Sequence, residues 1–395
     1  MNNTNKLNYI TYQTFPAESA NSIQSMTMIK YFIKNGYDVK LVFPNRDKNS
    51  QSNLEVLKNF YSINDNFDVN MTKHILPFGK FNFLKKIFFH FSHLLWSFFI
   101  TRKITKKNEL YFTRSDWVYY FLNKKGLKVI FEIHQYSKVR QFVLKYSKSK
   151  SSVYVFTTEL LKNSFFLDKQ KKDRSIVLHN GYDEELFYQN IDKQNRRIIF
   201  VGSLLRFNKE RGISFLIEAF KSDKLKNFSL YIVGGPENIV LKYKDILEHN
   251  KIKNVFFLGF KNRKDAILEM QKSEFGILYN EKSIHALNHT SPLKYFEYIG
   301  AGLKIVSVDY LAHRQLPGSD NLFYFDENDS NAFVEQILTA DKEQVFTKDK
   351  EGFGVNQRVK KLIQFVARLE GFEPPTPGSE VRCSIQLSYR RINTN

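Results

Sequence analysis

The residues with the clearest chemical potential stand between residues 288 and 309, where the sequence predicts a short helix. Ser291 is a good N-cap, and Pro292 suits the first helical position. The amphipathic run 293–299 follows, and two glycines end it. The apolar run 305–308 then predicts a buried strand, so the segment forms a helix-to-strand unit.

The start of this predicted helix can bind an anion. Free backbone N–H groups and the positive end of the helix dipole are expected near Leu293 and Lys294. Glu297 follows one turn later, and its carboxylate can accept a hydrogen bond from a sugar hydroxyl group. The segment can therefore hold a phosphate and a sugar hydroxyl together.

This segment resembles the signature of glycosyltransferase family 4. The family contains retaining enzymes of the GT-B fold, in which two Rossmann-like parallel-sheet domains face a central cleft. Its Ser-Pro-x-Lys-x-x-Glu segment grips a nucleotide sugar, which implies that residues 292–294 lie near the donor diphosphate and Glu297 near the nucleotide ribose. Many members carry a further Glu eight positions before the helical one. Here that position holds His289, which implies a changed contact with the donor sugar.

Length and composition narrow the class of protein. A chain of 395 residues with 42% apolar residues can bury two ordinary cores, which predicts two domains. The single cysteine, Cys383, excludes a disulfide framework and a Cys-based zinc site. Residues 1–6 are polar and lack the apolar core of a signal peptide, so we expect a cytoplasmic protein.

The chain is strongly basic. It has 60 lysines and arginines against 40 aspartates and glutamates, which gives a formal net charge of +20. This excess favours an anionic partner such as a phosphate, a membrane surface or nucleic acid. The alternative is that a Lys-, Asn-, Ile- and Phe-rich composition reflects coding bias, with the lysines on solvated faces.

The first half of the chain alternates strands with helices, which predicts a parallel sheet covered on both faces. Its strands are expected at residues 7–12, 39–43, 110–113, 128–133 and 152–157. The loop after the first strand lies where ligands bind in such folds. The resemblance places Asn21, Ser22 and Gln24 of this loop near the donor phosphates and the acceptor. An ordinary N-capped helix start explains the same residues.

Residues 78–107 combine a dense aromatic and apolar run with basic residues at both ends. The run is too short, and too broken by polar residues, to cross a bilayer, which needs about 20 apolar residues. A helix of this kind inserts shallowly into an anionic interface. We therefore expect a peripheral contact with the inner face of the cell membrane, made by residues such as Phe88, Trp96 and Phe99. A core helix of the first domain is the alternative.

His134 stands at the carboxyl end of a predicted strand, where a polar side chain can touch a substrate. The family has a functional histidine in a similar Glu-x-His setting close to the donor sugar, so the resemblance assigns His134 a role in catalysis. A structural histidine is the alternative. The motif at residues 176–183 resembles the strand and Asn-Gly-x-Asp turn that closes the first domain in this family.

The second half opens with a predicted strand at 197–201 and a glycine-bordered basic loop. A glycine after a strand, Gly202 followed by Ser203, lets the backbone approach a phosphate. Cations across this loop can neutralise the diphosphate charge, and we assign this role first to Arg211 and second to Lys209. The alternative is a solvated basic loop. Further strands are expected at 228–233, 255–258, 275–279 and 305–308.

These patterns divide the chain into four parts. Residues 1–186 are expected to form an acceptor-side Rossmann-like domain and residues 187–345 a nucleotide-sugar-binding one. Residues 346–367 predict a helix that crosses back onto the first domain. Residues 368–395 resemble antisense readthrough of a tRNA gene, and we expect a disordered, non-native tail without function there.

The resemblance predicts a metal-independent, retaining hexosyltransferase that needs no cofactor and takes a nucleoside diphosphate sugar as donor. No Asp-x-Asp pair sits in a suitable loop. The basic, membrane-prone first half suggests a glycan or lipid-linked acceptor in cell-envelope polysaccharide or glycolipid synthesis. A nucleic-acid binder without enzymatic activity is an alternative, but no nucleic-acid-binding motif is present. A sugar-nucleotide epimerase of the same fold is another, although the carboxylates for its acid–base chemistry are not evident.

Overall fold

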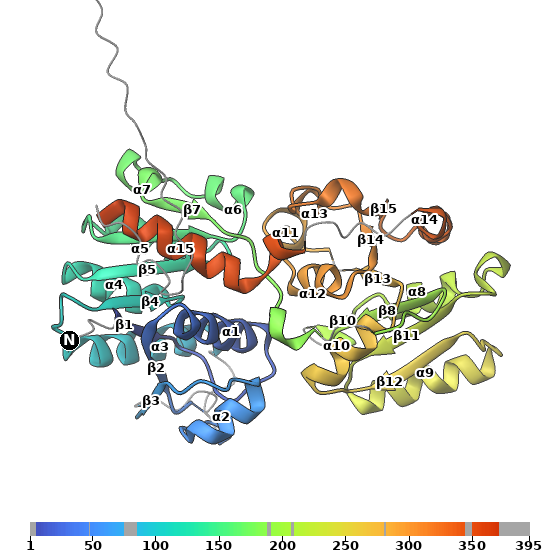
Figure 1. Cartoon of the computed structure of the whole chain (residues 1–395), viewed down its shortest axis with the longest axis horizontal. Helices are drawn as coiled ribbons and strands as arrows, with labels where there is room; N and C mark the ends of the chain where they lie inside the picture. The colour runs from blue at the N-terminus through green and yellow to red at the C-terminus, as the bar shows by residue number, and fades with distance from the viewer. Residues whose placement is uncertain are drawn as a thin grey trace, which may run out of the picture.

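The computed structural model describes residues 5–46, 48–74, 85–187, 191–206, 209–279, 282–343 and 350–370. These residues form two α/β domains side by side, each built on its own parallel sheet (Figure 1). The architecture confirms the predicted alternation of strands and helices in both halves of the chain.

The first domain contains a seven-stranded sheet in the order β3-β2-β1-β4-β5-β6-β7, with every neighbouring pair parallel. Its strands are β1 (Asn5–Ile10), β2 (Tyr37–Pro44), β3 (Asp68–Thr72), β4 (Leu110–Thr113), β5 (Lys128–Ile133), β6 (Ser152–Phe156) and β7 (Ser175–Val177). Parallel pairing needs a crossover between strands, and helices provide most of these crossovers.

Two separate cores cover the two faces of this sheet. Alternate residues of a strand point to opposite faces, so Leu41 of β2 packs in one core and Val42 in the other. The core on the Leu41 side contains side chains of α1 (Ala20–Lys34), α2 (Leu54–Tyr61) and α15 (Val355–Glu370). The core on the Val42 side contains side chains of α3 (Lys85–Arg102), α4 (Asp116–Lys124) and α5 (Lys138–Tyr146). The short helices α6 (Glu159–Asn163) and α7 (Lys169–Asp173) complete the domain.

The second domain contains a six-stranded parallel sheet in the order β12-β11-β8-β13-β14-β15. Its strands are β8 (Arg197–Val201), β11 (Ser229–Val233), β12 (Val255–Gly259), β13 (Phe275–Leu278), β14 (Lys304–Val308) and β15 (Phe323–Phe325). Its helices are α8 (Ile213–Ala219), α9 (Glu237–His249), α10 (Arg263–Gln271), α11 (Ile284–Asn288), α12 (Leu293–Ala301), α13 (Leu311–Arg314) and α14 (Ser330–Lys342). A small antiparallel ribbon, β9 (Leu205–Arg206) with β10 (Lys209–Glu210), follows β8.

The chain passes between the domains twice. The 3₁₀ helix η2 (Glu184–Leu186) follows the first domain, and η5 (Glu351–Phe353) precedes the return. At the crossing, the N–H of Val355 donates to the carbonyl of Tyr182 at 2.9 Å. Helix α15 then lies across α1 and buries Val359 and Leu362 in the first core (Figure 1). It runs through Glu370, and the tail beyond it lies outside the described residues.

Helix α3 accounts for the described part of the aromatic segment predicted at 78–107. Trp96, which we expected to contact a membrane, is only 3% exposed and donates from Nε1 to Oγ1 of Thr72 at 2.8 Å. Phe99, in contrast, is 44% exposed. One side of α3 therefore packs in the core of the first domain, while the other side is exposed. Within the described residues, no helix is both long enough and apolar enough to cross a membrane.

Candidate active site

The first turn of α12 is tied to the first domain by hydrogen bonds. Pro292 is the N-cap, so the prediction that Ser291 caps this helix is wrong. The Ser291 hydroxyl instead accepts from the backbone N–H of Asn180 at 3.0 Å, and the Asn180 amide donates to the Ser291 carbonyl at 2.5 Å. The Asn180 side-chain oxygen accepts in turn from Gln24 of α1. These bonds leave the N–H groups of the first turn of α12 free of a side-chain cap.

Glu297 lies one turn into α12 and is only 4% exposed. Its Oε2 is 2.5 Å from Nζ of Lys294, and its Oε1 is 3.9 Å from Arg263 at the start of α10. A buried carboxylate needs such cations, because burial without a partner costs several kcal/mol. The contact with Arg263 is too long for a hydrogen bond, so Oε1 can still accept one from a hydroxyl group.

Gly202 and Arg211 lie together after β8. A Cβ at position 202 would come within 3.0 Å of Nη1 of Arg211, so a larger residue would push the guanidinium away. Nη1 of Arg211 also lies 3.4 Å from the carbonyl oxygen of Ser203, whose own side chain is exposed. The backbone of Lys209 lies in β10, next to this loop, and its side chain lies outside the described residues.

The buried phenol of Tyr298 connects α12 with the ends of two strands of the second sheet. The hydroxyl of Tyr298 accepts from the N–H of Val201 at 3.2 Å and donates to the Ile277 carbonyl at 3.3 Å. Burial raises the pKa of Tyr298, the charge of Glu297 raises it further, and the charge of Arg211 opposes both. Tyr298 therefore joins the helix of the predicted acid, α12, to the carboxyl end of β8, where Gly202 and the predicted cation Arg211 lie.

His134 follows β5 in the first domain and contacts the buried carboxylate of Glu132. Its Nε2 is 2.5 Å from Oε1 of Glu132, whose other oxygen accepts from Arg358 of α15 at 2.8 Å. Burial lowers the pKa of His134 to about 3, and the positive charge of Arg114 adds to this effect. The imidazole is therefore neutral near pH 7.

The neighbours of His134 decide which of its ring nitrogens carries the proton. Burial alone would raise the pKa of Glu132, but Arg358, His134 and Arg114 hold it below its usual range, so Glu132 is a carboxylate that only accepts hydrogen bonds. The neutral His134 then carries its proton on Nε2. Its Nδ1 keeps a lone pair that can accept a hydrogen bond from a hydroxyl group.

Of the two interpretations of the loop after β1, the structure confirms the capped helix start, and the contact with donor and acceptor stays a prediction. Ser19 caps α1 by accepting from the N–H of Ser22, so the loop contains an ordinary helix start. Arg114 nevertheless donates to the side-chain oxygen of Asn21 at 3.1 Å, and Gln24 reaches Asn180. The loop is therefore bonded to the groups that lie between the domains.

His289 contacts the first domain across the boundary. It is the C-cap of α11, and its Nε2 lies 2.8 Å from the Ser164 hydroxyl. Burial lowers its pKa below the ordinary histidine value. The position of the first acid that the resemblance implied thus holds a neutral residue that links the two domains.

The structure gathers the predicted residues into two groups. Those of the second domain surround the start of α12 and the end of β8, and they are Gly202, Ser203, Arg211, Ser291, Pro292, Leu293, Lys294 and Glu297. Those of the first domain, His134 and Asn21, are joined through Arg114, which lies 3.8 Å from Glu132. Gln24 connects the groups through Asn180 and Ser291.

Sequence reasoning missed three arginines of this region. Arg114, Arg263 and Arg358 come from three different helices or loops, and each contacts an acid or amide that lies far away in the chain. Two of them have a local signal. Arg263 opens a helix just after a strand and a glycine, and Arg114 directly follows β4, as His134 follows β5. Arg358 stands in ordinary sequence surroundings.

Residues 182–358 match the family model described as glycosyl transferases group 1. Residues 182–358 belong to the glycosyl transferase group 1 family. This group 1 segment contains Arg211, Ser291 and Glu297, whereas His134 and Asn180 lie before it.

Two further comparisons extend this result. The chain is 27% identical over 135 residues to an uncharacterized glycosyltransferase of Methanocaldococcus jannaschii, and the alignment covers 34% of this chain and 35% of that protein. It is 23% identical over 179 residues to an uncharacterized 41.2 kDa protein from the cps region of Klebsiella pneumoniae, which covers 39% of this chain and 46% of that protein. The chain thus matches less than half the length of these two relatives.

Solved structures resemble the chain along nearly its whole length. A glycosyltransferase from Rickettsia africae has a TM-score of 0.65 at 13% identity, with 93% of this chain and 99% of that chain covered. The pneumococcal O-GlcNAc transferase in complex with UDP and GlcNAc has a TM-score of 0.64 at 11% identity, with coverage of 93% and 99%. These likenesses confirm the predicted GT-B fold.

Proposed function

We propose that the protein is a retaining, metal-independent glycosyltransferase that moves a sugar from a nucleoside diphosphate donor to an acceptor hydroxyl. The observation that carries this proposal is the hydrogen bond from Val201 to Tyr298, which joins the loop of Gly202 and Arg211 to α12, the helix that contains Glu297 and has an uncapped first turn. A ribose hydroxyl can bind the acid while the diphosphate binds the helix start and the cation. Similar structures that contain UDP or UDP-glucose support the choice of donor.

The reaction breaks the bond between the anomeric carbon and the diphosphate, so negative charge grows on the leaving group. Donors placed where that charge develops contribute most to such catalysis. Arg211, Lys294 and the N–H groups of α12 supply these donors in the second domain, and Lys209 is a further candidate. We propose that they stabilise the departing diphosphate without a metal ion.

The first domain supplies the groups that orient the sugar and the acceptor. Neutral His134 can accept a hydrogen bond from a donor-sugar hydroxyl at Nδ1, because Glu132 fixes its proton on Nε2. The loop that contains Asn21 and Ser22 is then the acceptor side. Because no nucleophilic side chain is assigned, we propose that a diphosphate oxygen takes the acceptor proton as the acceptor attacks the same face, which retains the anomeric configuration.

Glu297→Gln tests the donor site. The change keeps the shape of the side chain and removes the charge that accepts the ribose hydroxyl, so UDP should bind about tenfold or more weakly, since a hydrogen bond to a charged group contributes about 1.5–3 kcal/mol. Inorganic pyrophosphate, which has no ribose, should bind as well as before. Isothermal titration with both ligands measures the difference.

Glu335→Gln is the matched control, because Glu335 is an exposed acid of α14 that pairs with Lys224 far from the site. Equal weakening of UDP binding in both variants would refute the assignment of Glu297.

Incubation of the donor without acceptor distinguishes a glycosyltransferase from a sugar-nucleotide epimerase, because an epimerase would still convert the sugar. The acceptor is proposed to be a glycan or lipid-linked intermediate of the cell envelope.

A further inference from the structure

Helix α3 places polar residues inside the first domain and aromatic residues outside it. Ser97 is fully buried, and Ser92 is buried against Tyr12, whose hydroxyl lies 3.0 Å from the serine oxygen. On the opposite side, Phe91 and Phe98 are 50% and 42% exposed. A surface helix in water normally has the reverse arrangement. The outward side of α3 is therefore suited to an apolar environment.

Exposed and half-buried aromatic residues continue from α3 across α4 to α5. The ring centroids of Phe98 and Phe121 are 5.6 Å apart, those of Phe121 and Tyr120 are 5.5 Å apart, and those of Tyr120 and Phe142 are 6.4 Å apart. Tyr146 follows at 4.6 Å from Phe142. We call this set the aromatic face, and it consists of Phe91, Phe98, Phe99, Tyr120, Phe121, Phe142 and Tyr146.

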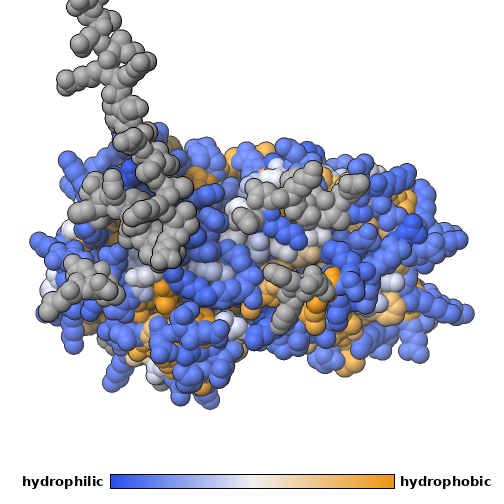
Figure 2. All heavy atoms as spheres, in the orientation of Figure 1, coloured by the Kyte–Doolittle hydropathy of each residue, from blue (hydrophilic) through white to orange (hydrophobic). Residues whose placement is uncertain are grey.

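The aromatic face is part of the surface opposite to the one formed by α1 and α15. Figure 1 draws α1 and α15 in front of the first sheet, and Figure 2 shows that this side of the molecule is mostly hydrophilic, with hydrophobic residues in separate smaller groups. The contrast matters because a monomeric protein rarely exposes a continuous apolar patch that has no binding function.

Basic residues accompany the aromatic face. Helices α3, α4 and α5 contain seven lysines and arginines and one acid, Asp116. That acid is 2.6 Å from Nε of Arg140, so its charge is already paired within the protein. On the face itself, Lys124 lies over the ring of Tyr120 and Lys145 over the ring of Tyr146, which favours an anionic partner.

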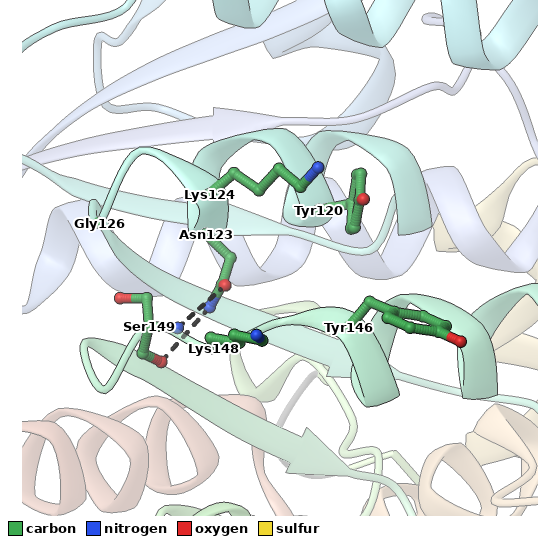
Figure 3. A pocket seen from close by; sticks show the side chains of 7 residues that line it. All are labelled: Tyr120, Asn123, Lys124, Gly126, Tyr146, Lys148 and Ser149. Carbon is green, nitrogen blue, oxygen red and sulfur yellow. Dashed lines mark hydrogen bonds between the residues drawn. The ribbon is translucent and has the colours of Figure 1, made fainter.

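A surface hollow of about 660 Å³ lies at the α4–α5 end of this face. Lys124 and Tyr120 of α4 line one side, and Tyr146 and Lys148 line the other, at the end of α5 (Figure 3). Asn123 and Ser149 form the floor, where the Ser149 N–H donates to the Asn123 side chain at 3.2 Å. Two lysines and two phenol groups around one hollow provide the hydrogen-bond donors that a phosphate group requires.

We propose that the aromatic face binds an anionic lipid bilayer and that the hollow between Lys124 and Lys148 receives a phosphate headgroup. Aromatic side chains with a polar edge prefer the boundary between lipid and water, and lysines near an anionic surface add to the affinity. The sequence suggested this contact for one helix. The structure extends it to three helices and shows that Trp96 takes no part, because it is buried.

Vesicle flotation of the full chain tests the proposal. The protein should float with vesicles of phosphatidylcholine and phosphatidylglycerol, and it should not float with phosphatidylcholine alone. Phe98→Ser, Phe99→Ser and Phe142→Ser combined should abolish flotation. The matched control combines Leu241→Ser, Ile284→Ser and Leu311→Ser, three residues of the second domain that are 52%, 76% and 52% exposed. Thermal unfolding shows whether each variant is folded.

A second pair of variants tests the hollow. Lys124→Glu with Lys148→Glu should weaken binding to the anionic vesicles by about tenfold or more, because each lysine near the surface contributes to the affinity. Lys242→Glu with Lys244→Glu changes the net charge equally on the exposed side of α9 and should leave vesicle binding almost unchanged. An equal loss in both pairs would show that only bulk charge matters and would overturn the headgroup site.

Other outcomes would overturn the membrane proposal as a whole. They are failure of the wild-type chain to float, equal flotation with neutral vesicles, and a dimer that the three serine substitutions convert to a monomer. The last result would show that a second copy of the chain covers the face. UDP binding, measured on the same variants, is independent of this test, so the donor site can fail while the membrane surface stands, or the reverse.

Discussion

At the scale of single residues, the candidate site depends on buried charges that are satisfied from distant parts of the chain. Glu297 is paired closely with Lys294 on its own helix and loosely with Arg263 from α10. The ion pair with Lys294 stabilises the buried carboxylate of Glu297. A ligand hydroxyl can replace the longer contact with Arg263. A sugar donor would therefore bind without leaving the Glu297 carboxylate unpaired.

Burial of His93 predicts a measurable dependence of stability on pH. Burial, with Arg46 nearby, lowers the pKa of His93 from 6.5 to about 3, so the folded protein does not bind a proton between these values while the unfolded chain does. The stabilisation is therefore present above about pH 6.5 and is lost as the pH falls towards about 3. Below pH 6.5 this residue contributes a slope of about 1.4 kcal/mol per pH unit to the free energy of unfolding.

His93→Phe should remove this slope. The ring stacks on Tyr12 at 4.3 Å, and its Nε2 is buried without a hydrogen-bond partner, so phenylalanine can fill the same place. Urea unfolding between about pH 7 and about pH 5 should show a shallower decline for the variant than for the wild type. His249→Gln, at an exposed position in α9, should keep the wild-type slope. Parallel curves for all three proteins would contradict the prediction.

At the scale of elements, the start of α8 positions Arg211. Gly212 is the N-cap of α8 with φ of +69°, and a Cβ there would lie 2.4 Å from the ring of Tyr279. Gly212→Ala should therefore destabilise the protein by about 1–3 kcal/mol, because it combines a left-handed backbone with overpacking. It should also weaken pyrophosphate binding, since the displaced loop contains Arg211. Thermal unfolding and isothermal titration measure the two effects.

Gly36→Ala is the matched control for this prediction. Gly36 has φ of +85°, but nothing lies within 4 Å of the Cβ that alanine would add. Only the backbone cost of about 1 kcal/mol should appear, and pyrophosphate binding should stay the same. Equal losses of stability and binding in the two variants would show that the contact with Tyr279 does not position the loop.

Elements with strong local signals could be predicted from the sequence, whereas contacts between elements could not. The helix at 293–299 and the strand at 305–308 were predicted close to the bounds of α12 and β14, because proline precedes the helix, glycines end it and the strand is a largely apolar run. Helices α2 and α5 were not predicted. The orientation of α3 was unpredictable because apolar residues surround the helix, so its periodicity does not indicate which side faces the core.

In the candidate site, too, contacts within one element could be predicted from the sequence, and contacts between elements could not. Lys294 and Glu297 share one turn of helix, so their proximity follows from sequence spacing. Arg358 contacts Glu132 only because α15, which follows the second domain in the sequence, packs on the first domain. No local pattern records such a contact, since it depends on the complete path of the chain.

At the scale of the whole molecule, Asp183 lies where the two crossings between the domains meet, because its neighbours Tyr182 and Glu184 bond to Val355 and Asn356. This acid is 1% exposed and lies between α1, the crossing segment and the second domain. It accepts from Nζ of Lys30 and from the hydroxyl of Tyr31, each at 2.8 Å, and its other oxygen is 3.8 Å from Arg263. Arg263 also lies 3.9 Å from Glu297, so one network connects the domain boundary with the donor site.

Removal of the charge of Asp183 should destabilise the whole protein. Asp183→Asn leaves the ammonium group of Lys30, whose side chain is 2% exposed, without its buried partner. Loss of this buried partner costs up to about 3–5 kcal/mol, because Lys30 stays desolvated and the acid that remains beside it, Glu185, is 39% exposed. Urea unfolding followed by circular dichroism should show a midpoint shifted to lower urea concentration.

Glu185→Gln separates the effect of burial from the effect of charge. Glu185 pairs with the same Lys30 at 3.1 Å, but its side chain is 39% exposed, so water can replace much of the lost interaction. Its removal should cost less than about 1 kcal/mol. If both variants lose the same stability, burial of Asp183 does not decide the strength of the boundary. If only Asp183→Asn is strongly destabilised, the boundary depends on one desolvated acid, and ligands that contact Arg263 can influence both domains through it.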